Sequence, residues 1–202
     1  MTKIKLCGLR RTADIEAANA LRPEFIGFVF AEKSRRRVTR EEAEALKARL
    51  DPGIRAVGVF VNAPAEEIAA LLAAGIIDMA QLHGQEGPED IARLRRLTDA
   101  PVIQAFRVKT REDVRMAEES PADLLLLDAG AGDGVAFQWD IAEGIRRPFF
   151  LAGGLTPENA GEAAERLRPF ALDVSSGIES GGWKDPEKMR AFVDAVRGRK
   201  EA

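Results

Sequence analysis

The stretch Phe149–Glu158 has the sequence FFLAGGLTPE and contains one complete transition from strand to loop to helix. Its apolar run, Phe149–Ala152, is too short for a helix and is followed by a glycine turn signal, which predicts a buried strand. Pro157 comes directly after Thr156, and proline is favoured at the first position of a helix, where an N–H would have no partner. The stretch therefore predicts the strand–loop–helix unit from which α/β folds are built.

The same unit recurs along the whole chain. Short runs rich in Val, Ile, Leu and Phe alternate with helical spacing and helix-start residues, such as Thr39 with Glu42 three residues later. Strands that are apolar on both faces and separated by helices are typical of parallel βαβ units. Eight such runs are present: Ile4–Cys7, Phe25–Phe30, Ala56–Val61, Met79–Leu82, Val102–Val108, Leu124–Leu127, Phe149–Ala152 and Phe170–Val174.

Eight units predict an α/β fold of the closed (β/α)8 barrel type, in one domain that covers residues 1–202. The alternative is a doubly wound dinucleotide-binding sheet. Its Gly-x-Gly-x-x-Gly fingerprint is absent after the first run, where Gly8 stands alone. A typical barrel has about 250 residues. A chain of 202 residues therefore predicts a barrel with short loops.

Composition narrows the possible chemistry. Hydrophobic residues make up 46% of the chain and charged residues 31%, which excludes a disordered or collagen-like protein. The net charge of −3 gives no strong field that would attract nucleic acid or a membrane surface. One cysteine and one histidine exclude an internal disulfide and a metal site with several Cys or His ligands. Residues 1–10 lack the apolar core of a signal peptide, and no membrane-length apolar window is present, so we expect a soluble, cytoplasmic protein.

Catalytic groups in such a barrel gather on the loops that follow the carboxyl ends of the strands. Cys7 ends the first run, and Asp128 follows the leucines of the sixth. A buried cysteine is often only a small apolar side chain, and an aspartate after a strand often caps a helix. An ionised aspartate beside a strand core is costly, however, and a thiolate at a barrel mouth can act as a base or nucleophile. We therefore expect both residues to be functional.

Glycine and serine loops follow the seventh and eighth runs. Gly153 and Gly154 precede a helix start, and Ser175-Ser176-Gly177 comes directly after the eighth run. Loops at these two places commonly bind phosphate through backbone N–H groups and hydroxyls. Two ordinary tight turns are the alternative, but their joint occurrence favours a phosphate site. Asp173, which faces inward on the eighth run, is expected to bind a sugar hydroxyl.

Two further segments lie at the predicted mouth. Arg35, Arg36 and Arg37 follow the second run, and one of these guanidinium groups could bind a substrate carboxylate through two hydrogen bonds. A solvated surface explains the arginine run equally well, and the spacing does not say which arginine would act. Gln81 and His83 end the fourth run. A lone histidine is more often a structural residue or a hydrogen-bond donor, so we expect this pair to contact substrate and not to supply the base.

With these residues in place, the sequence resembles the phosphoribosylanthranilate isomerase family of tryptophan biosynthesis. The matching segments follow in order and with the family's spacing over nearly the whole chain. Each segment alone is a weak signal, but their combination is specific. The segments are Lys5–Leu9 (KLCGL), Gly27–Phe30 (GFVF), Lys33–Arg36 (KSRR), Gly58–Asn62 (GVFVN), Gln81–Gly84 (QLHG), Leu126–Asp128 (LLD), Leu151–Asn159 (LAGGLTPEN) and Asp173–Glu179 (DVSSGIE).

The resemblance implies a cofactor-free isomerase that converts N-(5-phosphoribosyl)anthranilate to 1-(2-carboxyphenylamino)-1-deoxyribulose 5-phosphate by an Amadori rearrangement. Cys7 matches the family's general base, Asp128 its general acid and Arg36 the residue that binds the anthranilate carboxylate. The only partner implied is the small-molecule phosphosugar substrate, with the chain acting as a monomer or homodimer. Three further residues match the family's phosphate-binding loops: Gly154, Ser176 and Gly177.

One segment departs from the family. The loop Gly132–Trp139 has the sequence GDGVAFQW, whereas the family usually has Gly-x-Gly-Lys-Thr-Phe-Asp-Trp. Val135, Ala136 and Gln138 therefore replace Lys, Thr and Asp, while the acid Asp128 is kept. We expect this change to alter the rate more than the reaction.

Two other functions stay open at this point. The first is another phosphosugar barrel enzyme. A synthase of the indole-glycerol-phosphate type would need lysines and glutamates at the strand ends, and a histidine-pathway isomerase would need a carboxylate in place of Cys7. The second is a non-catalytic barrel that binds a phosphorylated ligand, which would not need Cys7 and Asp128 together. These residues do not determine whether a related histidine-pathway substrate is also accepted.

Overall fold

A computed structural model describes residues 1–128 and 139–198 and contains a closed barrel of eight parallel strands. The strands are β1 (Lys3–Cys7), β2 (Phe25–Val29), β3 (Arg55–Phe60), β4 (Met79–Leu82), β5 (Val102–Arg107), β6 (Leu124–Asp128), β7 (Phe149–Ala152) and β8 (Ala171–Val174). Each strand pairs with the next along the chain, and β8 pairs with β1 to close the ring. The predicted (β/α)8 barrel is therefore confirmed.

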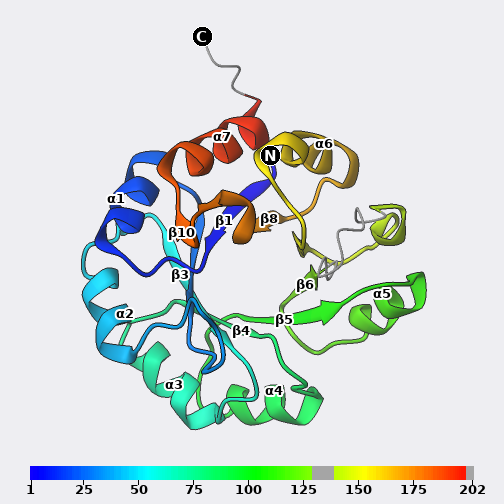
Figure 1. Cartoon of the computed structure of the whole chain (residues 1–202). Coiled ribbons are helices and arrows are strands. Elements are labelled where there is room, and N and C mark those ends of the chain that lie inside the picture. The colour runs from blue at the N-terminus through cyan, green and yellow to red at the C-terminus, as the bar shows by residue number, and fades with distance from the viewer. Residues whose placement is uncertain (129–138, 199–202) are drawn as a thin grey trace.

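Helices form an outer ring around the strands (Figure 1). They are α1 (Thr12–Leu21), α2 (Arg40–Lys47), α3 (Ala65–Ala73), α4 (Pro88–Arg95), α5 (Arg111–Glu118), α6 (Pro157–Leu167) and α7 (Pro186–Arg197). Two helix starts carry the predicted signals, because the Thr39 hydroxyl accepts a hydrogen bond from the Glu42 N–H and Pro157 opens α6. Pro186 opens α7 in the same way. Across residues 1–128 and 139–198, no helix has the length and apolar character needed to cross a membrane.

The sixth unit differs from the others. Between β6 and β7, the described residues contain a short 3-10 helix, η1 (Trp139–Ala142), and no α-helix. The altered loop, which includes Asp133-Gly134-Val135-Ala136 and the departures at Val135, Ala136 and Gln138, lies outside the described residues, so its effect on the rate stays a prediction.

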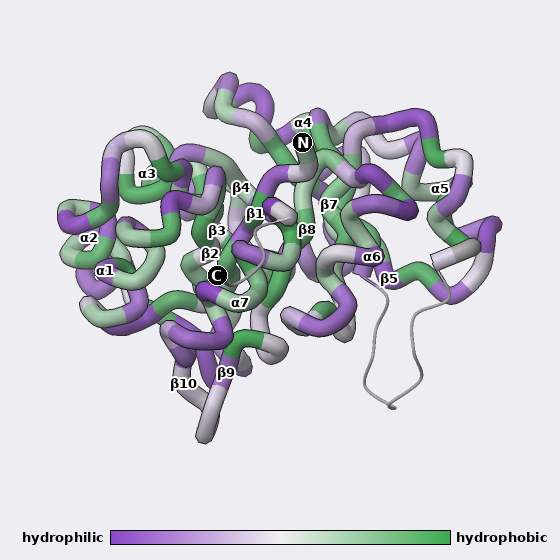
Figure 2. Tube along the Cα trace, turned by 90° about the horizontal axis from the view of Figure 1, so that it is seen from above, coloured by the Kyte–Doolittle hydropathy of each residue, from purple (hydrophilic) through white to green (hydrophobic). Residues whose placement is uncertain are grey.

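A short excursion separates β8 from α7. The chain first forms the 3-10 helix η2 (Ser176–Ile178) and then a hairpin of β9 (Glu179–Ser180) and β10 (Trp183–Lys184). Figure 2 shows this hairpin protruding from the barrel at the end opposite to the N-terminus. The hairpin therefore stands on the side of the barrel where the strands end.

Predicted and observed strand bounds differ by about one residue at several ends. The difference that matters for function is at Asp128, which was expected just after the sixth strand and is in fact its last residue. Its backbone is paired on both sides, with Arg107 of β5 and Ala152 of β7. The Asp128 carboxyl is therefore held on the barrel rim.

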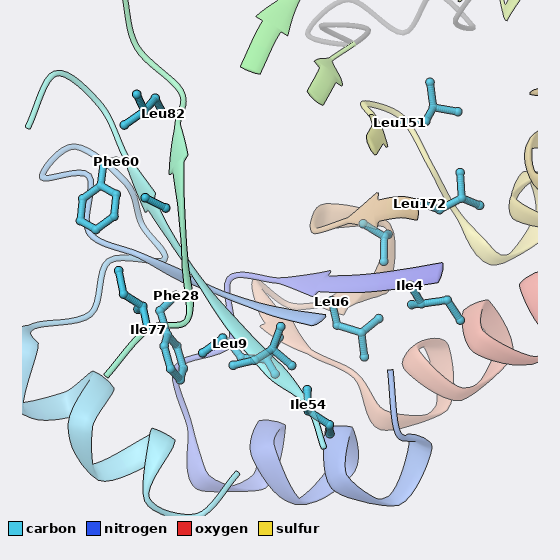
Figure 3. Packing of buried hydrophobic residues seen from close by; sticks show 14 of the residues in the cluster. Ile4, Leu6, Leu9, Phe28, Ile54, Phe60, Ile77, Leu82, Leu151 and Leu172 are labelled. Atoms are coloured by element: carbon cyan, nitrogen blue, oxygen red, sulfur yellow. The ribbon is translucent and has the colours of Figure 1, made fainter. Parts of the chain in front are cut away.

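The barrel has two apolar layers, because successive side chains of a strand point to opposite faces. Outward-facing residues pack beneath the helices, and Figure 3 shows Ile4, Leu6, Phe28, Leu151 and Leu172 in this layer. A second apolar cluster fills the barrel interior, where the rings of two phenylalanines meet edge to face. Its members are Phe25, Val57, Met79, Ile103, Leu126, Phe150, Ala152 and Ala171.

Carboxylates also connect neighbouring strands through hydrogen bonds at the end of the barrel where the strands begin. Three acidic residues, each directly before an even-numbered strand, accept a hydrogen bond from a backbone N–H near the start of the preceding odd-numbered strand. We call them the strand-start carboxylates. The three bonds run from Ile4 N–H to Glu24 at 2.8 Å, from Ala56 N–H to Asp78 at 2.7 Å and from Val102 N–H to Asp123 at 2.8 Å.

Candidate active site

Strand alternation brings Lys5 and Cys7 of β1 to the inside of the barrel, while Ile4 and Leu6 pack outward. Cys7 is 8% exposed and is the last residue of its strand. Gly27 on the paired strand leaves room for the thiol, because a Cβ at this glycine would lie 2.6 Å from the Cys7 Sγ. The glycine thus lets the sulfur lie against the backbone of β2 at the barrel mouth.

Below Cys7, a buried ion pair joins β1 to β8. The Lys5 ammonium is fully buried and donates to Asp173 Oδ2 at 2.8 Å. The other oxygen of this carboxylate, Oδ1, is buried and has no hydrogen-bond partner among the described residues. Since buried polar atoms in folded proteins are usually paired, Oδ1 is an acceptor that a ligand hydroxyl can use. Asp173 is thus placed inward, as predicted.

Charge and burial act in opposite directions on Cys7. Burial raises the pKa of the Cys7 thiol, the charge and hydrogen bond of Lys5 lower it, and the net shift is upward. Burial lowers the pKa of Lys5, but the neighbouring Asp173 charge raises it further, so the ammonium stays charged. Both shifts favour a neutral Cys7 thiol beside a charged Lys5 ammonium. For Cys7 to remove a proton from a substrate, its thiol would therefore first have to ionise.

Asp128, His83 and Gln81 form a chain across the strand ends. His83 Nε2 lies 3.4 Å from Asp128 Oδ2, and Gln81 Nε2 lies 2.8 Å from His83 Nδ1. With the amide donating to Nδ1, a neutral His83 carries its proton on Nε2 and directs it toward Asp128. The Gln81 Oε1 atom is buried and has no hydrogen-bond partner among the described residues. The three predicted residues thus lie together, with His83 beside the predicted acid.

The two predicted phosphate loops pack directly against each other. Gly153 and Gly154 both have positive φ, at 90° and 63°, which is a conformation that suits glycine. Gly177 touches the other loop so closely that an added Cβ would lie 1.9 Å from the Leu155 carbonyl oxygen. Together the loops present backbone and hydroxyl groups at the mouth, including those of two serines. Ser175 donates its hydroxyl to the Cys7 carbonyl at 3.1 Å, and Ser176 is exposed.

The structure shows which of the three arginines lies at the barrel mouth, a question that sequence spacing left open. Arg36 lies over Gly8, the residue that follows Cys7 in the chain, because a Cβ added to this glycine would be 2.5 Å from the Arg36 Cδ. Arg36 donates from Nε and Nη2 to the two oxygens of Glu179, at 2.6 and 2.9 Å. Arg35 and Arg37 are exposed, although Arg35 also reaches Glu179 at 2.7 Å. Arg36 is therefore the arginine at the mouth.

Three charged residues of the site were missed from the sequence: Lys5, Glu179 and Lys184. Lys184 is 4% exposed, and its ammonium donates to the Ser175 carbonyl and to Glu179, each at 2.8 Å. A signal for Lys5 was present, because a lysine between Ile4 and Leu6 interrupts an apolar strand. Within the described ranges, no cluster of three or more His, Cys, Asp or Glu residues could hold a metal ion.

Comparisons with known proteins agree on one family. The sequence profile of N-(5'phosphoribosyl)anthranilate (PRA) isomerase matches residues 4–195. The N-(5'-phosphoribosyl)anthranilate isomerase of Caldanaerobacter subterraneus subsp. tengcongensis is 44% identical, with 98% of this chain and 99% of the relative covered. The crystal structure of phosphoribosyl anthranilate isomerase from Thermotoga maritima superposes with a TM-score of 0.89 at 33% identity, covering 98% of this chain and 100% of that one.

A second solved structure contains a ligand. It is a phosphoribosyl anthranilate isomerase in complex with reduced 1-(o-carboxyphenylamino)-1-deoxyribulose 5-phosphate. Its TM-score is 0.85 at 32% identity, and the match covers 98% of this chain and 100% of that chain.

Proposed function

Because this chain belongs to the N-(5'-phosphoribosyl)anthranilate isomerase family, we propose that Cys7 is its general base and Asp128 its general acid. The chain is an isomerase of tryptophan biosynthesis, and its substrate is N-(5'-phosphoribosyl)anthranilate. The observation that carries the proposal is the placement of Cys7 and Asp128 at the ends of β1 and β6. These strands are far apart in the ring, so the thiol and the carboxyl approach a substrate from different sides.

In the proposed reaction, protonated Asp128 gives its proton to the ribose ring oxygen. The bond between this oxygen and C1′ breaks, and the anthranilate nitrogen takes up the positive charge as a Schiff base. The Cys7 thiolate then removes the proton from C2′, and the C–H electron pair neutralises the nitrogen to give an enolamine. Tautomerisation of the enolamine yields the ketone. Acid and base transfers of this kind each contribute about 10² to 10⁴-fold to a rate.

Lys5 and Asp173 support the base in this scheme. Asp173 keeps Lys5 charged, and the Lys5 ammonium stabilises the thiolate of Cys7 as it forms. The Asp173 charge also opposes the thiolate. A sugar hydroxyl that donates to the unpaired Oδ1 of Asp173 would weaken this repulsion. Substrate binding would thus favour ionisation of the Cys7 thiol, with its proton released to solvent, and so offset the raised pKa of this group.

The remaining predicted residues hold the substrate by its two anionic ends. Arg36 binds the anthranilate carboxylate, since a guanidinium can donate two parallel hydrogen bonds to it. Gln81 and His83 contact the substrate beside Asp128. The phosphate is bound by the paired loops at the end of the barrel where Cys7 lies. Its ligands are Gly153, Gly154, Ser175, Ser176 and Gly177.

The test is a fluorescence assay of the purified protein with freshly made phosphoribosylanthranilate. We expect consumption well above the spontaneous background, and a Cys7→Ala variant that loses about 10² to 10⁴-fold in kcat. The melting temperature of this variant should stay close to that of the parent protein, because alanine fits where cysteine packs. Near-parental turnover by Cys7→Ala would overturn the role of Cys7. Absence of turnover by the parent protein would leave only a phospho-ligand binding barrel.

Two further properties stay proposals of the same kind. A base that must be a free thiol suits a reducing compartment, and the chain has a single cysteine, so we place the protein in the cytoplasm. The chain acts as a monomer or a homodimer.

A further inference from the structure

Glu179 is surrounded by cations at the barrel mouth. The Glu179 side chain is 6% exposed and is paired with Arg35, Arg36 and Lys184 at 2.6 to 2.8 Å. Burial by itself raises the pKa of this carboxyl, but the hydrogen bonds and charges of Arg36 and Lys184 outweigh it and lower the pKa to about 2. Glu179 is therefore a permanent anion at neutral pH, at a place where the substrate also brings an anion.

The way Glu179 binds Arg36 leaves part of the guanidinium available. A guanidinium has five N–H donors, and Glu179 occupies one edge, formed by Nε and Nη2. The opposite edge, which comprises Nη1 and the second hydrogen of Nη2, donates no hydrogen bond among the described residues. Such an edge can accept a second carboxylate in the same bidentate geometry. One guanidinium can thus bridge two carboxylates.

Glu179 itself is held firmly. It begins the β9–β10 hairpin, and the Lys184 ammonium fixes one Glu179 oxygen at 2.8 Å from the other strand of this hairpin. The hairpin is tied to the loop after β1. The Trp183 ring stacks with Arg10 and Arg11, whose guanidinium carbons lie 3.8 and 4.8 Å from the ring centroid. Arg11 also donates to the Lys184 carbonyl at 2.7 Å.

We propose that Glu179 is a positioning residue for substrate recognition, which holds Arg36 so that its open edge receives the anthranilate carboxylate. Glu179 would then contribute to the preference for a carboxylated substrate without touching the substrate. This inference rests on the proposed function, because it takes Arg36 as the carboxylate ligand. A purely structural role for Glu179 is the alternative, and it predicts that loss of Glu179 affects every substrate alike.

The test compares two substrates on Glu179→Gln. One is phosphoribosylanthranilate, and the other is the analogue formed from ribose 5-phosphate and aniline, which lacks the carboxylate. Glutamine keeps the shape but removes the charge, so Arg36 is held less firmly. We expect KM for phosphoribosylanthranilate to rise about 10- to 100-fold with kcat within about 3-fold, and KM for the analogue to stay unchanged. A matched change on an exposed helix position, Glu44→Gln, is the control.

The coupling of Glu179 to Arg36 is tested separately with Arg36→Met. In that background, Glu179→Gln should have no further effect on KM, because the group that it positions is gone. Glu179→Asp keeps the charge and should therefore recover part of the affinity lost in Glu179→Gln. If Glu179→Gln folds poorly, Glu179→Asp replaces it in the comparison of the two substrates. An equal rise in KM for both substrates, or a full effect of Glu179→Gln in the Arg36→Met background, would refute the positioning role. If Arg36→Met alone leaves KM unchanged, the proposed role of Arg36 itself has failed.

Discussion

The two ends of the barrel use carboxylates in different ways. At the end where the strands begin, the strand-start carboxylates accept hydrogen bonds from backbone N–H groups, whose positions are fixed by the sheet. At the mouth, Asp128, Asp173 and Glu179 are paired with side chains of histidine, lysine and arginine. The strand-start carboxylates also pair with cations, namely Glu24 with Arg197, Asp78 with Lys47 and Asp123 with Arg95, but each keeps its hydrogen bond to a backbone N–H of the sheet. The difference separates carboxylates that align neighbouring strands from carboxylates that we propose to serve the substrate site.

The two kinds of carboxylate can be compared within one strand. Asp123 and Asp128 stand at opposite ends of β6. Asp128→Asn should lower kcat by about 10² to 10⁴-fold, because an amide cannot donate the acid proton, with little change in melting temperature. Asp123→Asn should do the reverse, with a lower melting temperature and unchanged kinetics. Steady-state assays and thermal melts of both variants measure these effects. Equal losses of kcat in the two variants would contradict the separate roles of Asp123 and Asp128.

Next in size is the buried pair of Lys5 and Asp173. Lys5→Met leaves the Asp173 charge buried without its cation, which should lower the free energy of unfolding by about 3–5 kcal/mol. The variant should also shift alkylation of Cys7 to higher pH, because the thiolate loses its neighbouring charge. Urea unfolding and the pH dependence of iodoacetamide labelling measure these two effects.

A double variant serves as the control for this pair. Lys5→Met with Asp173→Leu removes both charges, so stability should return while activity stays low. Recovery of activity together with stability would show that the pair serves only the fold.

A smaller effect concerns acid stability. The pKa of Glu179 is about 2 in the folded protein and near its ordinary value of 4.5 when unfolded. The unfolded chain therefore binds the proton more readily, and stability falls as pH drops through this window. At 1.36 kcal/mol per pKa unit, the loss due to Glu179 is at most about 3 kcal/mol. Urea unfolding between pH 5 and 3 should show a shallower loss for Glu179→Gln than for the parent, and parallel curves would contradict this.

Loss of a strand-start carboxylate should change stability only slightly. Asp78→Asn should lower the free energy of unfolding by about 1 kcal/mol, because it weakens the hydrogen bond from Ala56 and the ion pair with Lys47. Both kcat and KM should stay at the parental values, since Asp78 lies at the end away from the mouth. A changed KM would show that the hydrogen bond between Ala56 and Asp78 also affects the substrate site.

The fold was predictable because the strands are short apolar runs and several helix starts, such as Thr39 and Pro157, have their own signals. Cys7, Asp128 and the glycine loops could be found for a similar reason, since they stand directly at strand ends. The charge network could not be found from the sequence. Lys184 pairs with Glu179 only because the β9–β10 hairpin brings its two strands together at the mouth, and the sequence does not show this contact. The raised pKa of the Cys7 thiol also depends on burial, which spacing does not reveal.

The strand-start carboxylates have a consequence for how the chain can be divided. Each one joins a pair of consecutive strands, β1–β2, β3–β4 or β5–β6, so each of these pairs has its own hydrogen bond that aligns the two strands. A chain cut at Pro52-Gly53, between β2 and β3, keeps both partners of each hydrogen bond in the same fragment. A cut at Arg22-Pro23 parts Glu24 from Ile4. The two fragments from the first cut should therefore reassemble into the barrel better than the two fragments from the second, because every pair of strands joined by such a bond stays in one piece.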